Sequence, residues 1–282
     1  APLMAARMMP VVALPSHRFA DLTDREVEAA RDTGAIVALP VGATEQHSAH
    51  LPVGTDTHLA DTTALAAAER AKGVMVLVAP AIPFGLSPHH KSRPGTVTLR
   101  LATLQAVVRD AVMSFIDSGF VRVVIVNGHG GNVAPLSALV TELVTDGFPV
   151  TSVNYFDPGA ANWTSQLSGK LARVGHACEY ETAMMMQAAP DDATRITKAA
   201  AGLEPRLSQP YRLDPNDGDP IGRAGAAWPP IFSADDRGYF GDPAAASPDT
   251  GEQLFELTVD ALAMFFDEFA KAPLRTGKGA LR

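Results

Sequence analysis

Residues 36–58 read IVALPVGATEQHSAHLPVGTDTH, an apolar run typical of a buried strand followed at once by acidic and imidazole side chains. Those polar residues are Glu45, His47, His50, Asp56 and His58. In an extended chain Glu45 and His47 point to one face and Gln46 to the other. One carboxylate and one imidazole can hold one ion or two neighbouring ions, with Asp56 as a bridging carboxylate. The competing interpretation is a set of ordinary surface polar residues after a strand.

The composition of the 282-residue chain is that of a globular protein, with 46% hydrophobic and 19% charged residues. A net charge of −8 argues against nucleic acid or an anionic membrane surface as the main partner. The single cysteine, Cys178, excludes an intrachain disulfide. Because the sequence also shows no signal-peptide pattern, we expect a cytoplasmic protein. Residues 1–15 are too short, and too rich in proline, to span a bilayer.

Apolar strand-like runs alternate with helical segments through the first 156 residues. The predicted strands are 36–39, 74–80, 121–126 and 148–156, and the predicted helices are 24–34, 59–73, 103–118 and 133–147. Continuous apolar strands are typical of a parallel sheet that is covered on both faces. The pattern therefore predicts a three-layer α/β fold, with a mainly parallel sheet flanked by helices and ligands beyond the carboxyl ends of the strands.

The rest of the chain fits a single domain over residues 1–282. Residues 1–20 read as an N-terminal arm, and 203–250 as an irregular surface excursion that closes over the site or contacts a neighbouring subunit. A helix is predicted over 175–189, with His176 near its start, and a final helix over 249–272, capped by Asp249 or Thr250.

Seven of the eight histidines, all but His17, fall in four short segments at predicted strand ends or helix starts. In NGHGGN, residues 127–132, His129 stands among three glycines that allow close backbone approach. A phosphate-binding loop is the competing interpretation. However, Val133 replaces the third glycine of the dinucleotide fingerprint and no Walker lysine follows.

A third polar cluster lies at the start of the helix predicted over 175–189. On a helix, His176 and Glu179 share a face, whereas Glu181 is rotated away from His176. Glutamates in a first helical turn also serve simply to complement the helix dipole, so both interpretations stay open. Tyr155 and Phe156, at the end of a predicted strand, line a pocket or pack in the core.

Taken together, the motifs resemble the creatininase family of metal-dependent amidohydrolases, which also includes formamide deformylases and the peptidase that trims a mycofactocin precursor. The segments that carry the resemblance are 40–58, PGTVTL at 94–99, NGHGGN at 127–132 and HACEYET at 176–182, with GDP at 241–243 in a matching place. The resemblance runs over most of the chain, and the ordered spacing is more specific than any one motif.

The resemblance implies a centre of two divalent ions, of zinc, manganese or iron type. By position, Glu45 and His129 would bind one ion, His47 the other, and Asp56 both, with His176 as the general acid/base. Creatininases proper have a further glutamate where this chain has Gly131. We expect Glu179 to replace it as ligand and to join His176 among the catalytic residues, with Glu181 the less favoured candidate.

The implied reaction is hydrolysis of an amide, lactam or formamide C–N bond in a small molecule by a hydroxide that bridges the two ions. His176 would donate a proton to the leaving nitrogen. The residues expected to contact the substrate are His90, Arg93, Tyr155, Phe156 and Gly130, with backbone N–H groups of 128–132 facing the oxyanion.

Several alternatives remain at this point. Creatinine itself is a poor candidate substrate, because creatininases proper have tryptophans where Phe156 and Ala172 align. A peptidase trimming a short peptide, or a non-catalytic metal-binding assembly module, is an alternative function. The family commonly forms hexamers, so a homo-oligomer is expected.

Overall fold

The computed structural model describes residues 14–207 and 237–273. Most of the predicted N-terminal arm and residues 208–236 of the predicted excursion lie outside this range. Within the described residues, no helix is long and apolar enough to cross a membrane.

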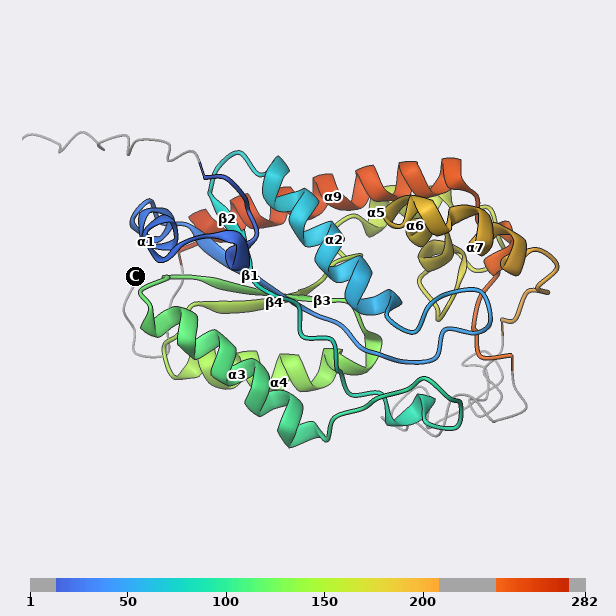
Figure 1. The fold of residues 1–282 in the computed structure, drawn as a ribbon, viewed down its shortest axis with the longest axis horizontal. Coiled ribbons are helices and arrows are strands. Elements are labelled where there is room, and N and C mark those ends of the chain that lie inside the picture. Colours follow the sequence, from blue (N-terminus) through green and yellow to red (C-terminus); the bar gives the residue numbers. More distant parts are fainter. Residues whose placement is uncertain (1–13, 208–236, 274–282) are drawn as a thin grey trace, which may run out of the picture.

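Four parallel strands form the central sheet (Figure 1). They are β1 (Ile36–Val41), β2 (Val76–Val78), β3 (Val123–Asn127) and β4 (Val150–Asn154), in the spatial order β2-β1-β3-β4. The register places Val41 beside Asn127 and Asn127 beside Asn154. Each predicted strand is therefore confirmed, and the loops that follow β1 and β3 leave the sheet as neighbours.

Helices cover both faces of the sheet, as the three-layer prediction requires. On one face, Ile36, Ala38 and Val124 pack against α2 (Thr55–Arg70), α6 (Glu179–Ala188) and α9 (Pro248–Lys271). On the other, Val37, Leu39 and Ile125 pack against α1 (Asp24–Asp32), α3 (Leu101–Asp117) and α4 (Val133–Thr145). Alternate strand residues thus belong to two separate cores, because side chains alternate across a strand. This accounts for the unbroken apolar strand sequences.

Helix starts follow the chemistry of their caps. Thr23 and Glu26 form the capping box of α1. α2 begins at Thr55, four residues before the prediction, so Asp56 lies in its first turn. α9 is capped by Ser247, whose Oγ accepts a hydrogen bond from the Thr250 backbone N–H. The prediction of Asp249 or Thr250 as cap is wrong, because Pro248 suits the first helical position and leaves Ser247 as N-cap.

The segment before α6 is extended rather than helical. His176 exchanges two backbone hydrogen bonds with Phe240, at 2.9 and 2.7 Å, and α6 begins only at Glu179. The expected helical relation between His176 and Glu179 is therefore wrong. Part of the predicted irregular excursion is ordered, since Arg206 also pairs with Gly241.

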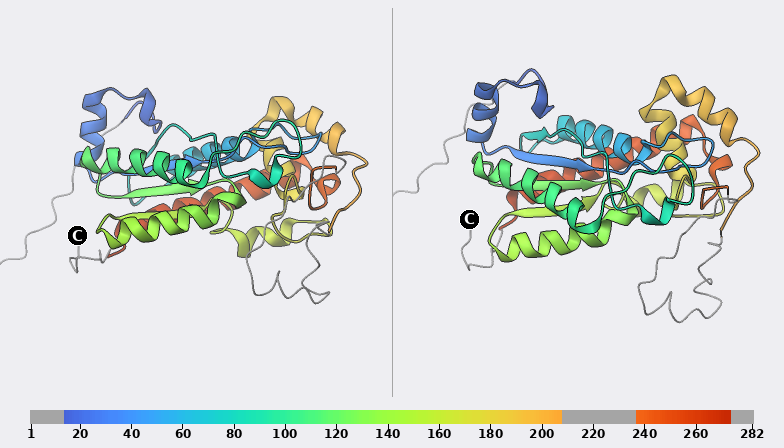
Figure 2. Two further views of the ribbon diagram at one scale, coloured as in Figure 1. Left: turned by 90° about the horizontal axis from the view of Figure 1, so that it is seen from below. Right: turned by 60° about the horizontal axis from the view of Figure 1, so that its bottom comes forward.

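In the described part of the chain, two α-helices were not predicted from the sequence, α5 (Ala160–Trp163) and α7 (Ala193–Ala200). The views in Figure 2 show α6 and α7 at the same end of the molecule as the loops that follow the strands.

Candidate metal centre

The polar clusters of the sequence meet at the carboxyl end of the sheet. Glu45 and His47 lie on the loop after β1, and His129 lies on the loop after β3. Because β1 and β3 are paired neighbours, these loops come together. Asp56 enters from the first turn of α2, which packs on the same strands.

Asp56 lies between two imidazoles. Its Oδ1 is 3.1 Å from Nε2 of His47, and its Oδ2 is 3.1 Å from Nδ1 of His129. The same His129 nitrogen is 3.3 Å from Oε2 of Glu45. All four side chains are at most 4% exposed. Each carboxylate oxygen of Asp56 thus faces a different imidazole, as a carboxylate bridging two ions would.

Three atoms of these buried side chains have no hydrogen-bond partner among the residues that the structure describes: Glu45 Oε2, His47 Nε2 and Asp56 Oδ2. Leaving a buried carboxylate or imidazole atom without a partner is costly. The atoms lie close to one another without hydrogen-bond geometry, as ligands that converge on a shared ion do. Nitrogen and oxygen donors without thiolate suit zinc, manganese or iron, so the residues present fit a divalent metal centre.

The two glutamates of α6 differ in what they contact. Glu179 accepts hydrogen bonds from the Ser168 backbone N–H at 2.8 Å, the Ser168 hydroxyl at 3.1 Å and the Gly169 N–H at 2.9 Å. Among the described residues, the groups with metal-binding geometry do not include Glu179. Glu181, in contrast, has a carboxylate oxygen within 4.8 Å of ligand nitrogens of His47 and His176.

Gly131 offers no room for the glutamate of creatininases proper. A Cβ at this position would overlap the Leu86 carbonyl oxygen and Nε2 of His129, and would lie 2.8 Å from His89. A side chain at residue 131 therefore requires the backbone to move. Glu181 is instead grouped with His47 and His176.

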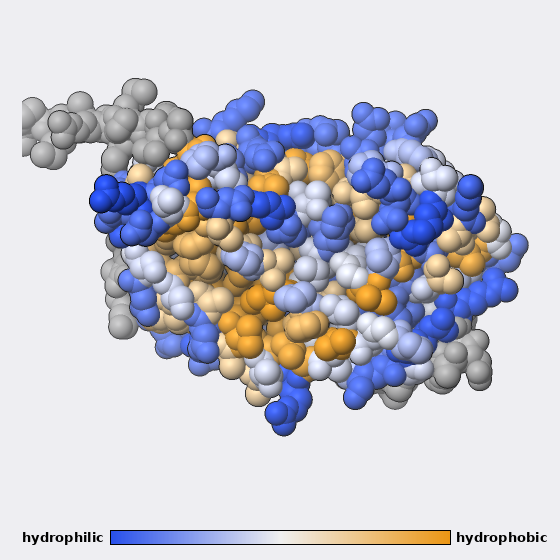
Figure 3. Space-filling view, viewed as in Figure 1, coloured by the Kyte–Doolittle hydropathy of each residue, from blue (hydrophilic) through white to orange (hydrophobic). Residues whose placement is uncertain are grey.

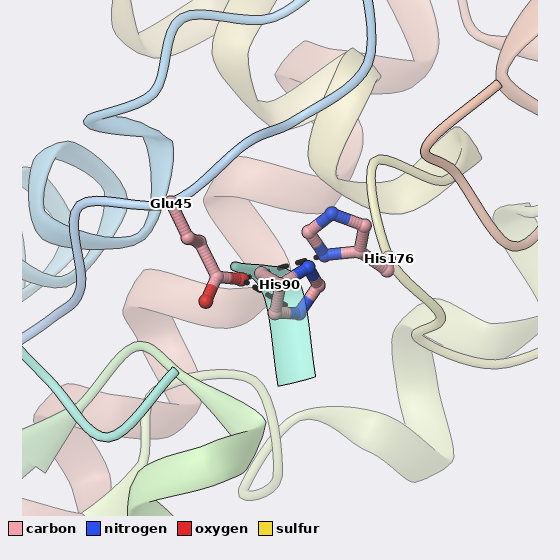
Figure 4. A group of neighbouring side chains, drawn as sticks. All are labelled: Glu45, His90 and His176. Atoms are coloured by element: carbon pink, nitrogen blue, oxygen red, sulfur yellow. Dashed lines mark ion pairs between the residues drawn. The ribbon is translucent and has the colours of Figure 1, made fainter. Parts of the chain in front are cut away.

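A second group of side chains, Glu45, His90 and His176, shares Glu45 with the first (Figure 4). Oε1 of Glu45 is 3.4 Å from Nε2 of His90 and 3.5 Å from Nδ1 of His176. The Gln46 side-chain nitrogen is 3.0 Å from the other ring nitrogen of each histidine. The expectation that Gln46 points away from the site is wrong. The chain turns at Ser48, where φ is 61°, so alternation along an extended strand does not apply.

The other histidines of the motifs divide between the cluster and the core. The His89 ring is parallel to that of His129, and His89 forms a group of metal-binding geometry with Glu45 and His129. His50 contacts Thr182 and His58 contacts the Ala188 carbonyl oxygen, so both pack against α6. His89 was not predicted from the sequence as a site residue. The pair of adjacent histidines in SPHH, residues 87–90, was the feature of the sequence that could have identified it.

The histidines of the site fall into two groups according to the direction in which their surroundings shift the pKa. Although burial acts against it, the Asp56 carboxylate raises the pKa of His47 to about 9. Burial also acts to lower the pKa of His129, but the carboxylates of Glu45 and Asp56 raise it well above its usual value. Burial, reinforced by neighbouring imidazoles, lowers the pKa of His90 and His176, leaving both neutral at pH 7. Burial raises the pKa of Glu181 to about 7.

The other residues that the sequence predicted to contact the substrate differ in how deeply they are buried. Arg93 is half-buried and lies beside Gly238, where an added Cβ would be 2.8 Å from the Arg93 Nε. Tyr155 is buried in the core against Tyr180, and Phe156 packs edge-on against Tyr155. A Cβ on Gly130 would have open space around it.

Comparisons with known proteins agree on one family. The family model Creatininase, described as creatinine amidohydrolase, matches residues 20–266. The mycofactocin precursor peptide peptidase of Mycolicibacterium smegmatis is 30% identical over 231 residues, 81% of this chain and 83% of that protein. The creatinine amidohydrolase of Pseudomonas putida is 27% identical over 271 residues, 86% of this chain and 93% of that protein. The chain therefore belongs to the creatininase family of hydrolases.

Solved structures support the same assignment. A creatinine amidohydrolase (creatininase) superposes with a TM-score of 0.70 at 26% identity, covering 89% of this chain and 97% of that one. A putative creatinine amidohydrolase from Bacteroides fragilis gives 0.70 at 30% identity, covering 85% and 91%. A creatininase described with Mn gives 0.71 at 27% identity, covering 90% and 98%, and a further matching creatininase is a mutant of Zn–Zn type. The three-layer fold expected from the sequence is that of creatininases.

Proposed function

We propose that the protein is a metal-dependent amidohydrolase that cleaves a C–N bond of a small molecule with two divalent ions of zinc, manganese or iron type. The observation that carries this proposal is Asp56, whose two buried oxygens face His47 on one side and His129 on the other at 3.1 Å. A carboxylate in this position can ligate two neighbouring ions at once.

Glu45, Asp56 and His129 would hold one ion, and His47, Asp56 and Glu181 the other. Glu181 takes the place that the sequence suggested for Glu179, because both oxygens of Glu179 are engaged by the backbone of residues 168–169. Glu179 is accordingly assigned to holding that loop, with no part in the chemistry. Two such ions supply a water of lowered pKa and a Lewis acid for the substrate carbonyl.

His176 is the proposed general acid/base. Its Nε2 lies 2.8 Å from the Gln46 carbonyl oxygen and 3.0 Å from the Gln46 side-chain nitrogen, and its Nδ1 lies 3.5 Å from Oε1 of Glu45. Because burial and neighbouring imidazoles lower the pKa of His176, the neutral ring can take a proton from water and deliver it to the leaving nitrogen.

Substrate orientation is proposed for His90 and Arg93. The backbone N–H groups near Gly130 are the proposed oxyanion donors, since the space beside that residue is open. Tyr155 and Phe156 are the remaining predicted contact residues, and they pack against each other at the core. As the resemblance implies, we expect the protein to act as a homo-oligomer.

A peptidase that trims a short peptide is the second candidate function. The observation in its favour is the 30% identity to the mycofactocin precursor peptide peptidase. A small-molecule substrate is favoured by the 27% identity to creatinine amidohydrolase over a longer span of the chain.

The experiment that tests the proposal compares the wild type with His176→Asn after loading both with manganese or zinc. Each is assayed on a panel of amides, lactams, formamides and short peptides, and its metal content is measured in parallel. We expect the variant to keep its metal and to lose about 100-fold or more of the rate on the best compound. Unchanged turnover by the metal-loaded variant would contradict the role of His176. Metal binding without turnover of any compound would favour a non-catalytic module.

A further inference from the structure

The GDP sequence at residues 241–243 belongs to a segment that is fastened to the chain around His176. Phe240 exchanges backbone hydrogen bonds with His176 at 2.9 and 2.7 Å. Next to it, Gly241 exchanges two with Arg206, both at 2.8 Å. The proposed general acid/base is therefore held by a segment whose side chains are not among the proposed metal ligands.

Asp242 follows directly after this pairing, and its carboxylate is directed to a third segment. The side chain is 7% exposed, and its Oδ2 accepts a hydrogen bond from the Lys170 backbone N–H at 3.0 Å. Asp242 stands at the N-cap position of the short 3₁₀ helix Pro243–Ala245, where an aspartate commonly caps the helix with its side chain. The Asp242 side chain makes no such capping hydrogen bond. Its carboxylate serves the turn at residues 168–170 instead.

Two buried carboxylates share that turn. The backbone N–H groups of Ser168 and Gly169 donate to Glu179 at 2.8 and 2.9 Å, and the next N–H group, that of Lys170, donates to Asp242. A Cβ on Gly169 would lie 2.7 Å from Oε2 of Glu179 and 2.9 Å from Cβ of Asp242, so the two acidic side chains approach the turn closely. Hydrogen bonds to an ionised carboxylate are about twice as strong as neutral ones. The turn therefore ties the start of α6 to the GDP sequence.

The backbone on both sides of His176 is tightly constrained. Ala177, which follows it, has a φ of 46°, in the left-handed region that a non-glycine residue keeps only where its surroundings hold it. Gly175, which precedes it, packs so closely that a Cβ there would overlap the Phe240 carbonyl oxygen. The Phe240 ring packs against Leu171, the residue after the turn. A shift of Phe240 would therefore move His176.

We propose that Asp242 is a positioning residue, which fixes the His176 ring at the metal centre through the turn at 168–170 and the pairing with Phe240. Its effect on catalysis rests on the proposed function, in which His176 moves the proton. Misplacing a reacting group by about 1 Å can cost about 100-fold in rate. Loss of the Asp242 carboxylate should therefore slow catalysis without removing a metal ligand.

The test compares Asp242→Ala and Asp242→Asn with the wild type, all loaded with zinc. Asparagine keeps an oxygen that can accept the hydrogen bond from Lys170, whereas alanine does not. Asp191→Ala is the control, because Asp191 is an exposed aspartate in another short 3₁₀ helix, Pro190–Asp192. Metal content, kcat and KM on the best compound of the panel are measured for each protein.

We expect Asp242→Ala to keep its metal and its KM but to lose about 100-fold in kcat. Asp242→Asn should recover about tenfold of that loss, and the control should match the wild type. A wild-type kcat in Asp242→Ala, loss of metal from the folded variant, or equal losses with alanine and asparagine would overturn the proposal. If Asp242→Ala does not fold, the asparagine variant decides, and a wild-type kcat there would overturn the proposal.

Histidine NMR tests the placement of His176 without any substrate. The ring signals of His176 in zinc-loaded protein labelled with ¹⁵N-histidine are assigned by their absence from His176→Asn. We expect them to shift or broaden in Asp242→Ala, or in Asp242→Asn if the alanine variant does not fold. The signals of His17, whose ring contacts the Val76 carbonyl oxygen, should stay in place. Unchanged His176 signals would overturn the proposal.

The two measurements separate this inference from the proposed function. Altered His176 signals in a protein that hydrolyses no compound would contradict the proposed function and support the placement of His176 by Asp242. Hydrolysis by the wild type, with His176 signals and kcat unchanged in the folded Asp242 variants, would contradict only the role of Asp242.

Discussion

At the residue scale, Glu179 and Glu181 are neighbours in the sequence with different surroundings. We predict that Glu181→Gln lowers the metal content from about two ions per chain to about one, because an amide is a poor replacement for a ligating carboxylate. Elemental analysis after dialysis against trace metal measures this loss. An unchanged content of two ions would remove Glu181 from the ligand set.

Glu179→Gln is the matched variant with the opposite expectation. Its carboxylate accepts three hydrogen bonds from residues 168–169. The variant should keep both ions but lose about 1–3 kcal/mol of the free energy of unfolding, since a buried hydrogen-bonded charge is removed. Denaturant unfolding of the metal-loaded protein measures the difference. Loss of an ion in this variant with no loss of stability would restore Glu179 as the metal ligand that the sequence predicted.

The pH dependence of stability follows from the buried His47. In the metal-free chain its pKa is about 9, above the value near 6.5 of an unfolded chain. Its contribution to stability is complete below pH 6.5 and is lost as the pH rises through 9. Glu181, with a pKa raised to about 7, acts in the same direction between pH 4.5 and 7.

We therefore predict that the Tm of the metal-free protein falls by about 5–10 °C between pH 6.5 and 9. Because metal binding requires a deprotonated imidazole, the metal-loaded protein should not show this fall. Thermal unfolding of both forms across the range measures the difference in Tm. If the Tm of both forms fell in the same way with rising pH, protons and metal would not compete at His47.

The site residues differ in how well the sequence predicted them. Glu45, His47, Asp56 and His129 converge as expected, because neighbouring strand ends bring their loops together. Gln46 was misjudged, since alternation along a strand could not anticipate the turn at Ser48. The assignment of Glu179 depended on where α6 begins, and the pairing of His176 with Phe240 decides that start.

At the element scale, the turn after β3 packs directly against the first turn of α2. A Cβ on Gly128 would overlap the Asp56 carbonyl oxygen and lie 3.0 Å from Ala60. We predict that Gly128→Ala displaces the helix start that carries Asp56. The expected cost is about 1–3 kcal/mol of the free energy of unfolding, with weaker metal binding. Denaturant unfolding and zinc competition with a chromogenic chelator measure the two effects.

Gly130→Ala in the same loop is the control, because a Cβ there meets nothing within 4 Å. It should leave stability and metal affinity within about 0.5 kcal/mol of the wild type. A raised KM in this variant would support Gly130 as a substrate contact. Equal effects of the two substitutions would contradict the close packing of this turn against α2.

Elements with strong local signals were the predictable ones. The capping box at Thr23 and the apolar strands have signatures within a few residues. The short helices α5 and α7 and the extended segment before α6 do not, because packing and pairing with distant residues define them. The pairing partner of His176 lies 64 residues further along the chain, beyond any local pattern.

At the scale of the whole molecule, parallel strands bring residues from distant parts of the sequence to one end of the sheet. The fold class was predictable for the same reason, since alternating strands and helices permit few arrangements. The exposed apolar residues Phe84, Val97 and Leu101 had no signal in the sequence that set them apart from core residues. Single exposed apolar residues are ordinary on a protein surface.

The central claim is that this cluster holds two divalent ions through Glu45, Asp56 and their histidine partners. The most direct measurement is the metal content of protein purified without chelator, beside the Glu45→Ala/Asp56→Ala double variant. We predict about two ions per chain in the wild type and none in the folded variant. A wild type that takes up no zinc or manganese after reconstitution, or a double variant that keeps both ions, would contradict the assignment.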